Sequence, residues 1–275
     1  MRWTSTTDAT RIPAAAEQWL LRDPAHNTVA LTVLHRYRSG VWAEGMFVGW
    51  LSSAEEPGEE DVRGVVVHTK GYPVVLSEFP VEFVPPLAET LRGRELAAAS
   101  GPVRQVEAFA EAWGHEPVRR MDERLYRLGT LIDPAVPGRA RPAGLDDLEL
   151  MVDWYVAFVE EADAPGRDPD PRAQVRHRID RGELIVWEHE GAVVSLAGFT
   201  TPIAGMSRVG MVYTPPERRR RGYASAVTHA ATEAARKAGA GEVVLFTDLA
   251  NPTSNSIYQA LGYRPISDHL TLFFE

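Results

Sequence analysis

Two apolar runs and the helical pattern between them dominate the second half of the chain. Residues 209–213 have the character of a buried strand, which Pro215-Pro216 ends. Alanine and valine then recur at helical spacing over residues 224–238, and Gly239 follows where a helix would end. Residues 242–247 form a second continuous apolar run, typical of a strand buried on both faces. The pattern predicts a strand, a loop, a helix and a second strand parallel to the first.

The first half of the chain predicts a similar order of strands and helices. The expected strands cover residues 41–51, 62–68, 74–79 and 124–132, and the expected helices cover residues 20–34, 85–91 and 103–113. Asp23-Pro24 interrupts what would otherwise be one element with residues 14–21. The strand-strand-helix-strand-helix-strand order resembles that of the second half, which predicts a diverged copy of one fold; an unrelated α+β domain is the alternative.

A segment rich in proline and glycine separates the two halves and predicts a domain boundary. It contains Pro134, Pro137 and Gly138 without an apolar period. We therefore expect one domain over residues 1–133, a linker over 134–140 and a second domain over 141–275. In the second domain, Asp146 is the expected N-cap of a helix with an apolar stripe. Further on, Glu190-Gly191 predicts a hairpin.

Composition and charge exclude several classes of protein. The chain has 275 residues, of which 44% are hydrophobic and 24% charged, with a net charge of −9. The negative charge argues against a nucleic-acid or anionic membrane partner, and no apolar run approaches a membrane span. Cysteine is absent, which excludes an acyl-cysteine intermediate. The start of the chain shows no signal peptide, and the strong preference for arginine over lysine is typical of a GC-rich genome. We expect a cytoplasmic, bacterial protein.

The loop before the helix at 224–238 has the properties of an anion site. A helix N-terminus presents unpaired N–H groups and partial positive charge. Gly222 allows close approach of a ligand to the backbone, and Arg219 and Arg221 add charge that suits phosphate. The loop lacks the Gly-Lys-Ser/Thr of a P-loop and the three glycines of a dinucleotide site. A pyrophosphate is the expected ligand; a solvated arginine face and a nucleic-acid patch are the alternatives.

The stretch Arg219-Arg220-Arg221-Gly222-Tyr223-Ala224 resembles motif A of the GNAT superfamily of acetyl-CoA-dependent N-acetyltransferases, whose pattern is Arg/Gln-x-x-Gly-x-Gly/Ala. The resemblance continues through residues 251–258 and closes with Leu261-Gly262-Tyr263. It implies an α/β (α+β) fold of two tandem GNAT-like domains. Each would be a mixed, mostly antiparallel sheet with flanking helices and a splayed central pair of parallel strands. Only the second domain would bind the coenzyme, because the first has no basic glycine loop.

The resemblance also implies which residues contact acetyl-CoA, the expected co-substrate. The expected coenzyme-binding residues are Met211, Val212, Tyr213, Arg219, Arg220, Arg221, Gly222, Tyr223, Ala224, Asn251, Ser254, Asn255 and Tyr258. The backbone of residues 211–213 would pair with the pantetheine arm, and the amides of residues 219–224 would hold the pyrophosphate. Asn251 also fits the N-cap of a helix with Pro252 in its first turn.

By the same resemblance, Tyr258 is the acid that protonates the departing thiolate; a core tyrosine is the alternative. The expected strand carboxylate is missing, so the candidate bases are Glu160, Glu161, a chain of water molecules and the carboxylate of Glu275. The histidines show no metal-ligand spacing, and we expect no metal.

The sequence therefore predicts direct acetyl transfer to a primary amine, on a small molecule or a protein N-terminus, by a protein that could form a homodimer. A non-catalytic acyl-CoA-binding or regulatory module is the alternative function, and a partner-binding tandem protein is the third.

Overall fold

The computed structural model describes residues 1–38, 45–162 and 170–274 of the chain, which divides into two compact units. The first unit comprises Met1–Arg124 with Ser267–Glu275, and the second comprises Leu125–Ile266. None of the described helices is long and apolar enough to span a membrane.

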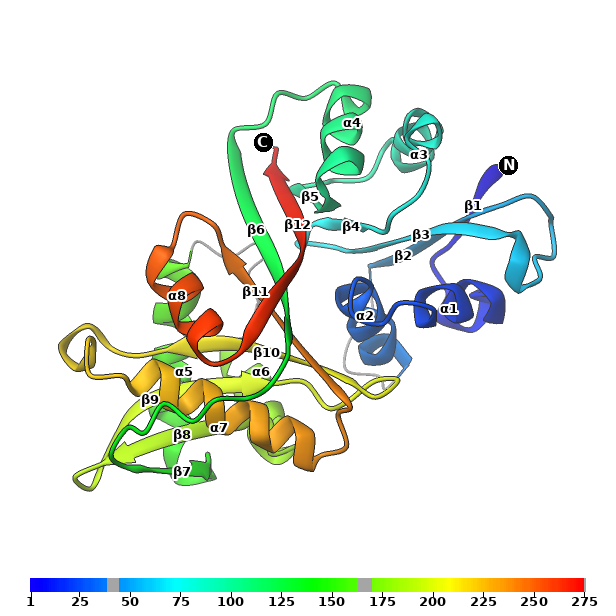
Figure 1. The fold of residues 1–275 in the computed structure, drawn as a ribbon. Coiled ribbons are helices and arrows are strands. Elements are labelled where there is room, and N and C mark those ends of the chain that lie inside the picture. The colour runs from blue at the N-terminus through cyan, green and yellow to red at the C-terminus, as the bar shows by residue number, and fades with distance from the viewer. Residues whose placement is uncertain (39–44, 163–169, 275) are drawn as a thin grey trace. The chain divides into compact units, whose positions relative to one another are not determined.

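The two units repeat one order of elements, which can be followed by colour in Figure 1. In the first half these are β1 Arg2–Thr6, α1 Ala14–Leu21, α2 Thr28–Arg38, β2 Met46–Ser52, β3 Val62–Thr69, β4 Val74–Leu76, α3 Val84–Leu91, β5 Ala98–Pro102, α4 Val103–Trp113 and β6 Arg119–Leu128. In the second half they are β7 Arg139–Pro142, α5 Leu148–Glu161, α6 Pro171–Asp180, β8 Leu184–His189, β9 Ala192–Phe199, β10 Met206–Tyr213, α7 Tyr223–Lys237, β11 Glu242–Asp248, α8 Pro252–Ala260 and β12 Tyr263–Phe273.

Each unit contains a mixed, mostly antiparallel sheet with a central parallel pair of strands. In the first unit β1, β2, β3 and β4 pair antiparallel in turn, and β4 pairs with β5 in parallel. In the second unit β7, β8, β9 and β10 pair antiparallel in turn, and β10 pairs with β11 in parallel. This architecture, repeated in the same order, confirms the expected fold class of two tandem α/β domains.

The last strand of each half continues into the other unit. Residues of β12 from His269 to Phe273 pair antiparallel with β5 in the first unit. There Leu270, Leu272 and Phe274 join the core that α3 and α4 cover. The end of β6, in contrast, lies beside β11 in the second unit, where Arg127 and Glu242 form an ion pair of 3.3 Å. The units therefore begin and end at other residues than the expected ranges 1–133 and 141–275.

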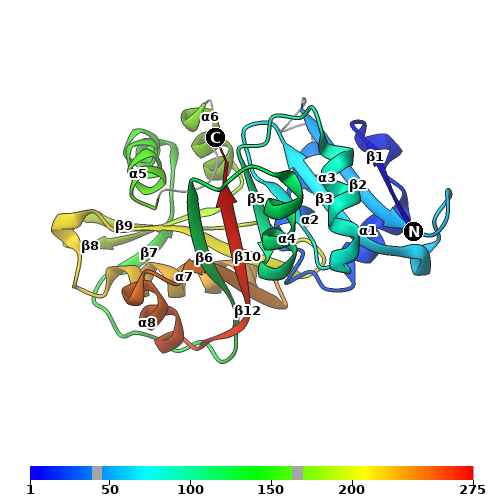
Figure 2. The ribbon, with the colours of Figure 1, turned by 90° about the horizontal axis from the view of Figure 1, so that it is seen from above.

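Helices cover both faces of the sheet in the second unit, and the strand alternation explains how. Ile185, Ala197 and Val209 face a core shared with α7 and α8. Alternate residues of the same strands, such as Val186 and Leu196, face a core shared with α5 and α6. In the first unit α3 and α4 lie side by side in both views (Figures 1 and 2).

Several expected boundaries were wrong. The strand expected over 124–132 begins at Arg119 and ends at Leu128. The strand expected over 41–51 begins at Met46, and residues 41–44 lie outside the described part of the chain. Asp146 is not the N-cap of α5, because a 3-10 turn at Leu145–Asp147 precedes the helix. The carboxylate of Asp147 instead accepts hydrogen bonds from the Gly144 amide (2.7 Å) and the Arg141 guanidinium.

Two buried histidines in the first unit predict a loss of stability in mild acid. Burial lowers the pKa of His68 to about 4, and the charge of Arg94 contributes. A hydrogen bond with the backbone of Tyr72 acts in the opposite direction but does not outweigh burial. Burial is also the main cause that lowers the pKa of His269 to about 4. The charge of His26 lowers this pKa further, whereas the charge of Asp268 raises it. Between pH 6.5 and 4 the unfolded chain therefore binds more protons at these positions than the folded protein.

The expected result is a free energy of unfolding that falls as the pH is lowered from 6.5 to 4.5. The full pKa shift of one such histidine corresponds to a change of up to about 3 kcal/mol in the free energy of unfolding. Urea unfolding over this range checks it, with His68→Asn expected to have a shallower slope than the wild type. His35→Asn is the control, because His35 is exposed on α2. Equal slopes for His68→Asn and the wild type would contradict the assignment to His68.

Candidate active site

The loop between β10 and α7 has the backbone geometry of an anion site. Pro215 ends the strand, a 3-10 turn covers Pro216–Arg218, and Gly222 precedes α7 with φ of 80°. Gly222 has no side chain that could cap the helix, so within the described part of the chain the N–H groups of the first turn of α7 lack a side-chain cap. These donors, together with the positive end of a helix of 15 residues, favour a negatively charged ligand.

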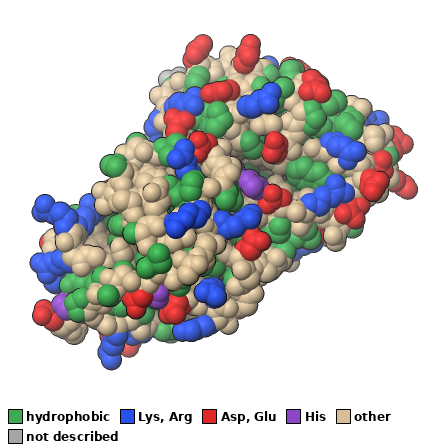
Figure 3. Space-filling model, in the orientation of Figure 1, with side chains coloured by type: hydrophobic (Ala, Val, Ile, Leu, Met, Phe, Trp, Pro, Cys, Tyr) green, Lys and Arg blue, Asp and Glu red, His purple; other side chains and the backbone are tan. Residues whose placement is uncertain are grey.

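Two of the expected phosphate-binding arginines are free to serve this site. Arg220 and Arg221 are exposed, and neither has an ion-pair or hydrogen-bond partner among the described side chains. Arg220 also has a left-handed backbone, with φ of 62°, which turns the chain just before the helix. Figure 3 shows basic side chains gathered at the edge where Figure 1 draws this loop. The loop thus combines exposed positive charge with backbone N–H donors.

Arg219 is held differently from its neighbours. Its Nε donates to the carbonyl oxygen of Thr214 (2.9 Å), and its Nη2 donates to Oε2 of Glu161 (2.6 Å). This hydrogen bond with Glu161 is the main cause that raises the pKa of Arg219. The carboxylate of Glu161, a candidate base, is therefore engaged by the guanidinium of Arg219. Glu160 is exposed at the end of α5, and the carboxylate of Glu275 lies outside the described residues.

The parallel strands β10 and β11 separate towards the loop. Their register covers only Met206–Arg208 on β10 and Glu242–Val244 on β11. Beyond it, the pairing of β10 with β9 shifts between Gly210 and Tyr213, and Met211 has φ of 59°. A bulge of this kind redirects backbone groups away from the regular ladder. The backbone of Met211, Val212 and Tyr213 is thus placed beside the gap, where an extended amide-bearing ligand could add as a strand.

The side chains of this strand end pack into the protein. Met211 and Tyr213 are buried in the core beneath α5, while Val212 packs against the core beneath α7. Burial raises the pKa of Tyr213, with a further contribution from Glu161. The side chains of Met211 and Tyr213 are therefore turned into the core, which leaves the main chain of residues 211–213 and the partly buried Val212 to face a ligand.

Helix α8 brings the remaining expected residues together after β11. Asn251 is its N-cap and accepts from the Ser254 amide at 3.0 Å, which confirms the capping role. The Asn255 side chain donates to the carbonyl oxygens of Asp248 (2.9 Å) and Asn251 (2.8 Å), and its Oδ1 accepts from the Tyr126 hydroxyl (3.0 Å). Both asparagines therefore shape the start of the helix, whatever else they contact.

Tyr258 lies on α8 with its ring in the core of the second unit. It is 8% exposed and contacts the ring of Tyr263 edge-on, with centroids 6.4 Å apart. Burial raises the pKa of Tyr258 to about 12, against the effect of a hydrogen bond with Ser254. The hydroxyl therefore holds its proton at neutral pH, as a general acid must before it acts.

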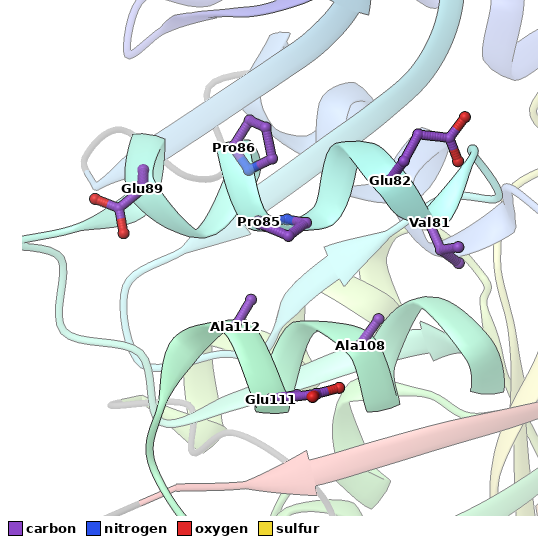
Figure 4. Close-up of a pocket in the computed structure, with 8 residues that line it drawn as sticks. All are labelled: Val81, Glu82, Pro85, Pro86, Glu89, Ala108, Glu111 and Ala112. Atoms are coloured by element: carbon purple, nitrogen blue, oxygen red, sulfur yellow. The ribbon is translucent and has the colours of Figure 1, made fainter.

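Among its described residues, the first unit has no counterpart of this anion site. The connection from β4 to α3 contains Pro80, and α3 has Pro85 and Pro86 in its first turn, so N–H donors are missing where the second unit presents them. A hollow of about 730 Å³ lies between α3 and α4 (Figure 4). Its lining includes Glu82, Glu89 and Glu111 beside small apolar side chains, and these carboxylates would repel phosphate.

A contact that the sequence pattern did not predict lies at Gly222. A Cβ placed on Gly222 would come within 2.8 Å of Cγ2 of Val136, in the expected linker. The linker is fixed there, because the Pro137 carbonyl accepts from Nε1 of Trp187 at 3.2 Å and Arg139 pairs with Glu188 at 2.8 Å. The sequence motif marks Gly222, but no local sequence pattern indicates that it contacts a residue more than eighty positions away.

Gly222→Ala is expected to destabilise the protein more than Gly191→Ala does. Both glycines are left-handed, with φ of 80° and 78°, but a Cβ at Gly191 meets no atom within 4 Å. Gly191→Ala should lower the free energy of unfolding by about 1 kcal/mol, because alanine is strained in a left-handed backbone. Gly222→Ala should lower it by at least about 1 kcal/mol more, because the added Cβ also overpacks against Val136. Urea unfolding measures the difference, which Val136→Ala should remove. Equal losses of stability in Gly222→Ala and Gly191→Ala would show that the Val136 side chain moves aside without an energetic penalty.

Among the residues that the structure describes, no group of His, Asp and Glu side chains could hold a metal ion. Ser195 is fully buried and bonded to the Tyr213 carbonyl (3.0 Å) and to Thr214 Oγ1 (2.8 Å), so it is a structural residue of β9 rather than an exposed nucleophile.

Comparison with known proteins points to one family. Residues 148–263 match the model of the acetyltransferase (GNAT) family. No curated protein sequence matches significantly. Among solved structures, an acetyltransferase of the GNAT family from Colwellia psychrerythraea covers 100% of both chains at 11% identity, with a TM-score of 0.63. A GCN5-related N-acetyltransferase from Sphaerobacter thermophilus covers 98% of this chain and 95% of its own at 14% identity, with a TM-score of 0.60.

A tandem GNAT protein from the clavulanic acid biosynthesis pathway covers 98% of both chains at 13% identity, with a TM-score of 0.58. At these identities the likeness shows the fold alone. It extends over both units, whereas the match to the family model lies in the second half of the chain.

Proposed function

Because residues 148–263 form a GNAT acetyltransferase domain, we propose that the protein transfers the acetyl group of acetyl-CoA directly to a primary amine. The observation that carries this proposal is the β10–α7 loop, which combines uncapped helix N–H groups with the free side chains of Arg220 and Arg221. Family and fold support acetyl transfer in general. The arrangement of charged and polar groups in the second unit supports direct transfer from acetyl-CoA to a primary amine.

Coenzyme binding would use main chain and charge together. The pyrophosphate would accept from N–H groups at the start of α7 and from the guanidinium groups of Arg220 and Arg221. The pantetheine amides would pair with the backbone of β10 beyond Arg208, where the register with β11 ends. The thioester would then lie in the gap between the two strands.

The transfer itself needs an attacking amine and a proton for the leaving sulfur. The neutral amine attacks the thioester carbonyl carbon, the carbon–sulfur bond breaks, and the thiolate of CoA takes the hydroxyl proton of Tyr258. The nitrogen loses a proton to water, and the tyrosinate regains one from solvent. The chain has no cysteine, so the acetyl group passes directly to nitrogen. Since Glu161 is engaged by Arg219, we propose water rather than Glu161 as the proton acceptor.

A screen of primary amines, with release of the CoA thiol as the signal, tests this function. The signal is clean because the protein contains no thiol. Small amines, amino acids, amine-bearing antibiotics and peptide N-termini form the panel, and the net charge of −9 favours cationic members. Turnover with one class supports the proposal. Saturable CoA binding without turnover on any member would favour the alternative, an acyl-CoA-binding or regulatory module.

A further inference from the structure

Arg219 belongs to the basic loop in sequence, yet its guanidinium is bonded away from α7. Of the two groups that it contacts, the Thr214 carbonyl lies just after β10 and the Glu161 carboxylate lies at the last residue of α5. Arg219 therefore joins three places: the end of a central strand, the end of a helix and the start of the coenzyme loop.

The two anchors of Arg219 are themselves fixed by packing. Helix α5 buries Met151 and Trp154 against the sheet, and the ring of Trp154 contacts that of Tyr213 with centroids 5.8 Å apart. Thr214 is also buried and hydrogen-bonded, through Oγ1, to Ser195. The bridge from Glu161 through Arg219 to Thr214 thus ties the exposed loop to a helix and a strand end that pack into the core of the second unit.

We propose that Glu161 and Arg219 are positioning residues that hold the coenzyme loop in its binding conformation. This inference rests on the proposed function. Arg219 acts by fixing the first half of the loop, so that Arg220, Arg221 and the N–H groups of α7 converge on one anion. Glu161 acts through Arg219 and is neither the general base nor a contact of the coenzyme.

The alternative is that Arg219 binds phosphate itself and that Glu161 competes for it. The two accounts predict opposite effects of removing the carboxylate charge. If Glu161 competes, Glu161→Gln frees the guanidinium and removes a negative charge near the anion, so coenzyme binding tightens. If Glu161 positions the loop, the same change weakens binding although the net charge becomes more favourable. The sign of the effect therefore separates positioning from simple electrostatics.

The experiment measures the Kd for desulfo-CoA by calorimetry in Glu161→Gln, Arg219→Gln and the double variant. Each single change is expected to weaken binding about fivefold. The double variant should also weaken it about fivefold, and not by the product of the two single effects, because both changes remove the same bridge. The net charge of the pair is zero in the double variant, as in the wild type. Asp153→Asn is the control, because it removes an exposed carboxylate from the same helix and should leave the Kd unchanged.

Tighter or unchanged binding in Glu161→Gln would overturn the inference, as would multiplicative losses in the double variant. The pair is about half exposed, with side chains 40% and 52% accessible, so the variants are expected to fold with near-normal stability. Urea unfolding checks this. If the wild type does not bind desulfo-CoA at all, the proposed function is rejected, and the inference with it. If the wild type binds but the variants behave otherwise than expected, the inference alone fails.

Discussion

Replacing Tyr258 with phenylalanine is expected to lower kcat about a hundredfold with an accepted amine, while the Kd for CoA stays within about twofold of the wild type. The hydroxyl supplies the proton that the thiolate needs, and burial keeps that proton in place by raising the pKa of Tyr258 to about 12. The ring, which makes the packing contacts of the residue, is retained in the variant. Steady-state kinetics and calorimetry measure the two quantities separately.

Tyr263→Phe is the matched control for Tyr258→Phe. Tyr263 is fully buried, contacts the Tyr258 ring, and shares a hydrogen bond of 2.6 Å with Oγ1 of Thr232. Loss of its hydroxyl should lower the free energy of unfolding by about 1 kcal/mol and leave kcat near normal. Similar kcat values in Tyr258→Phe and the wild type would show that Tyr258 serves packing alone.

The second large effect is expected from removal of the two free arginines of the loop. The double variant Arg220→Ala with Arg221→Ala should bind desulfo-CoA about a hundredfold more weakly, because each charge-assisted contact with phosphate is worth about tenfold. Calorimetry at low and moderate ionic strength measures it, and the affinity of the double variant should depend less on salt than that of the wild type.

A double variant at the other end of α7 controls for net charge. Arg236→Ala with Lys237→Ala removes the same two positive charges from the last turn of the helix, where both side chains are exposed. Its affinity for desulfo-CoA should stay within about twofold of the wild type, since the interaction is screened over the length of the helix. Equal losses in the two double variants would mean that the loop attracts the coenzyme only through overall charge.

The structure of the β10–α7 loop could be predicted from sequence because its determinants are local. Pro215 ends a strand by lacking an N–H donor, the period of residues 224–238 predicts α7, and Gly222 marks the left-handed turn between them. Asn251 was likewise predicted as a cap, since the cap and the amide that it accepts lie three positions apart.

The remaining features depend on contacts between distant positions. Glu161 precedes Arg219 by 58 positions, so the sequence suggested a base and a phosphate ligand where the structure has an ion pair. The pattern of β12 shows a strand but not which sheet it joins, because apolar alternation is satisfied equally well beside β5 or β11. Val136 has no pattern at all that would place it against Gly222.

The central claim is that one unit of the two binds acetyl-CoA, and calorimetric titration of the wild type tests it most directly. The account predicts saturable binding with one site per chain, retained with desulfo-CoA, because among the described residues the second unit alone presents a glycine turn with uncapped N–H groups at the start of a long helix. Two sites per chain would show that the proline-containing connection of the first unit also binds the coenzyme. No binding of either ligand would contradict the claim.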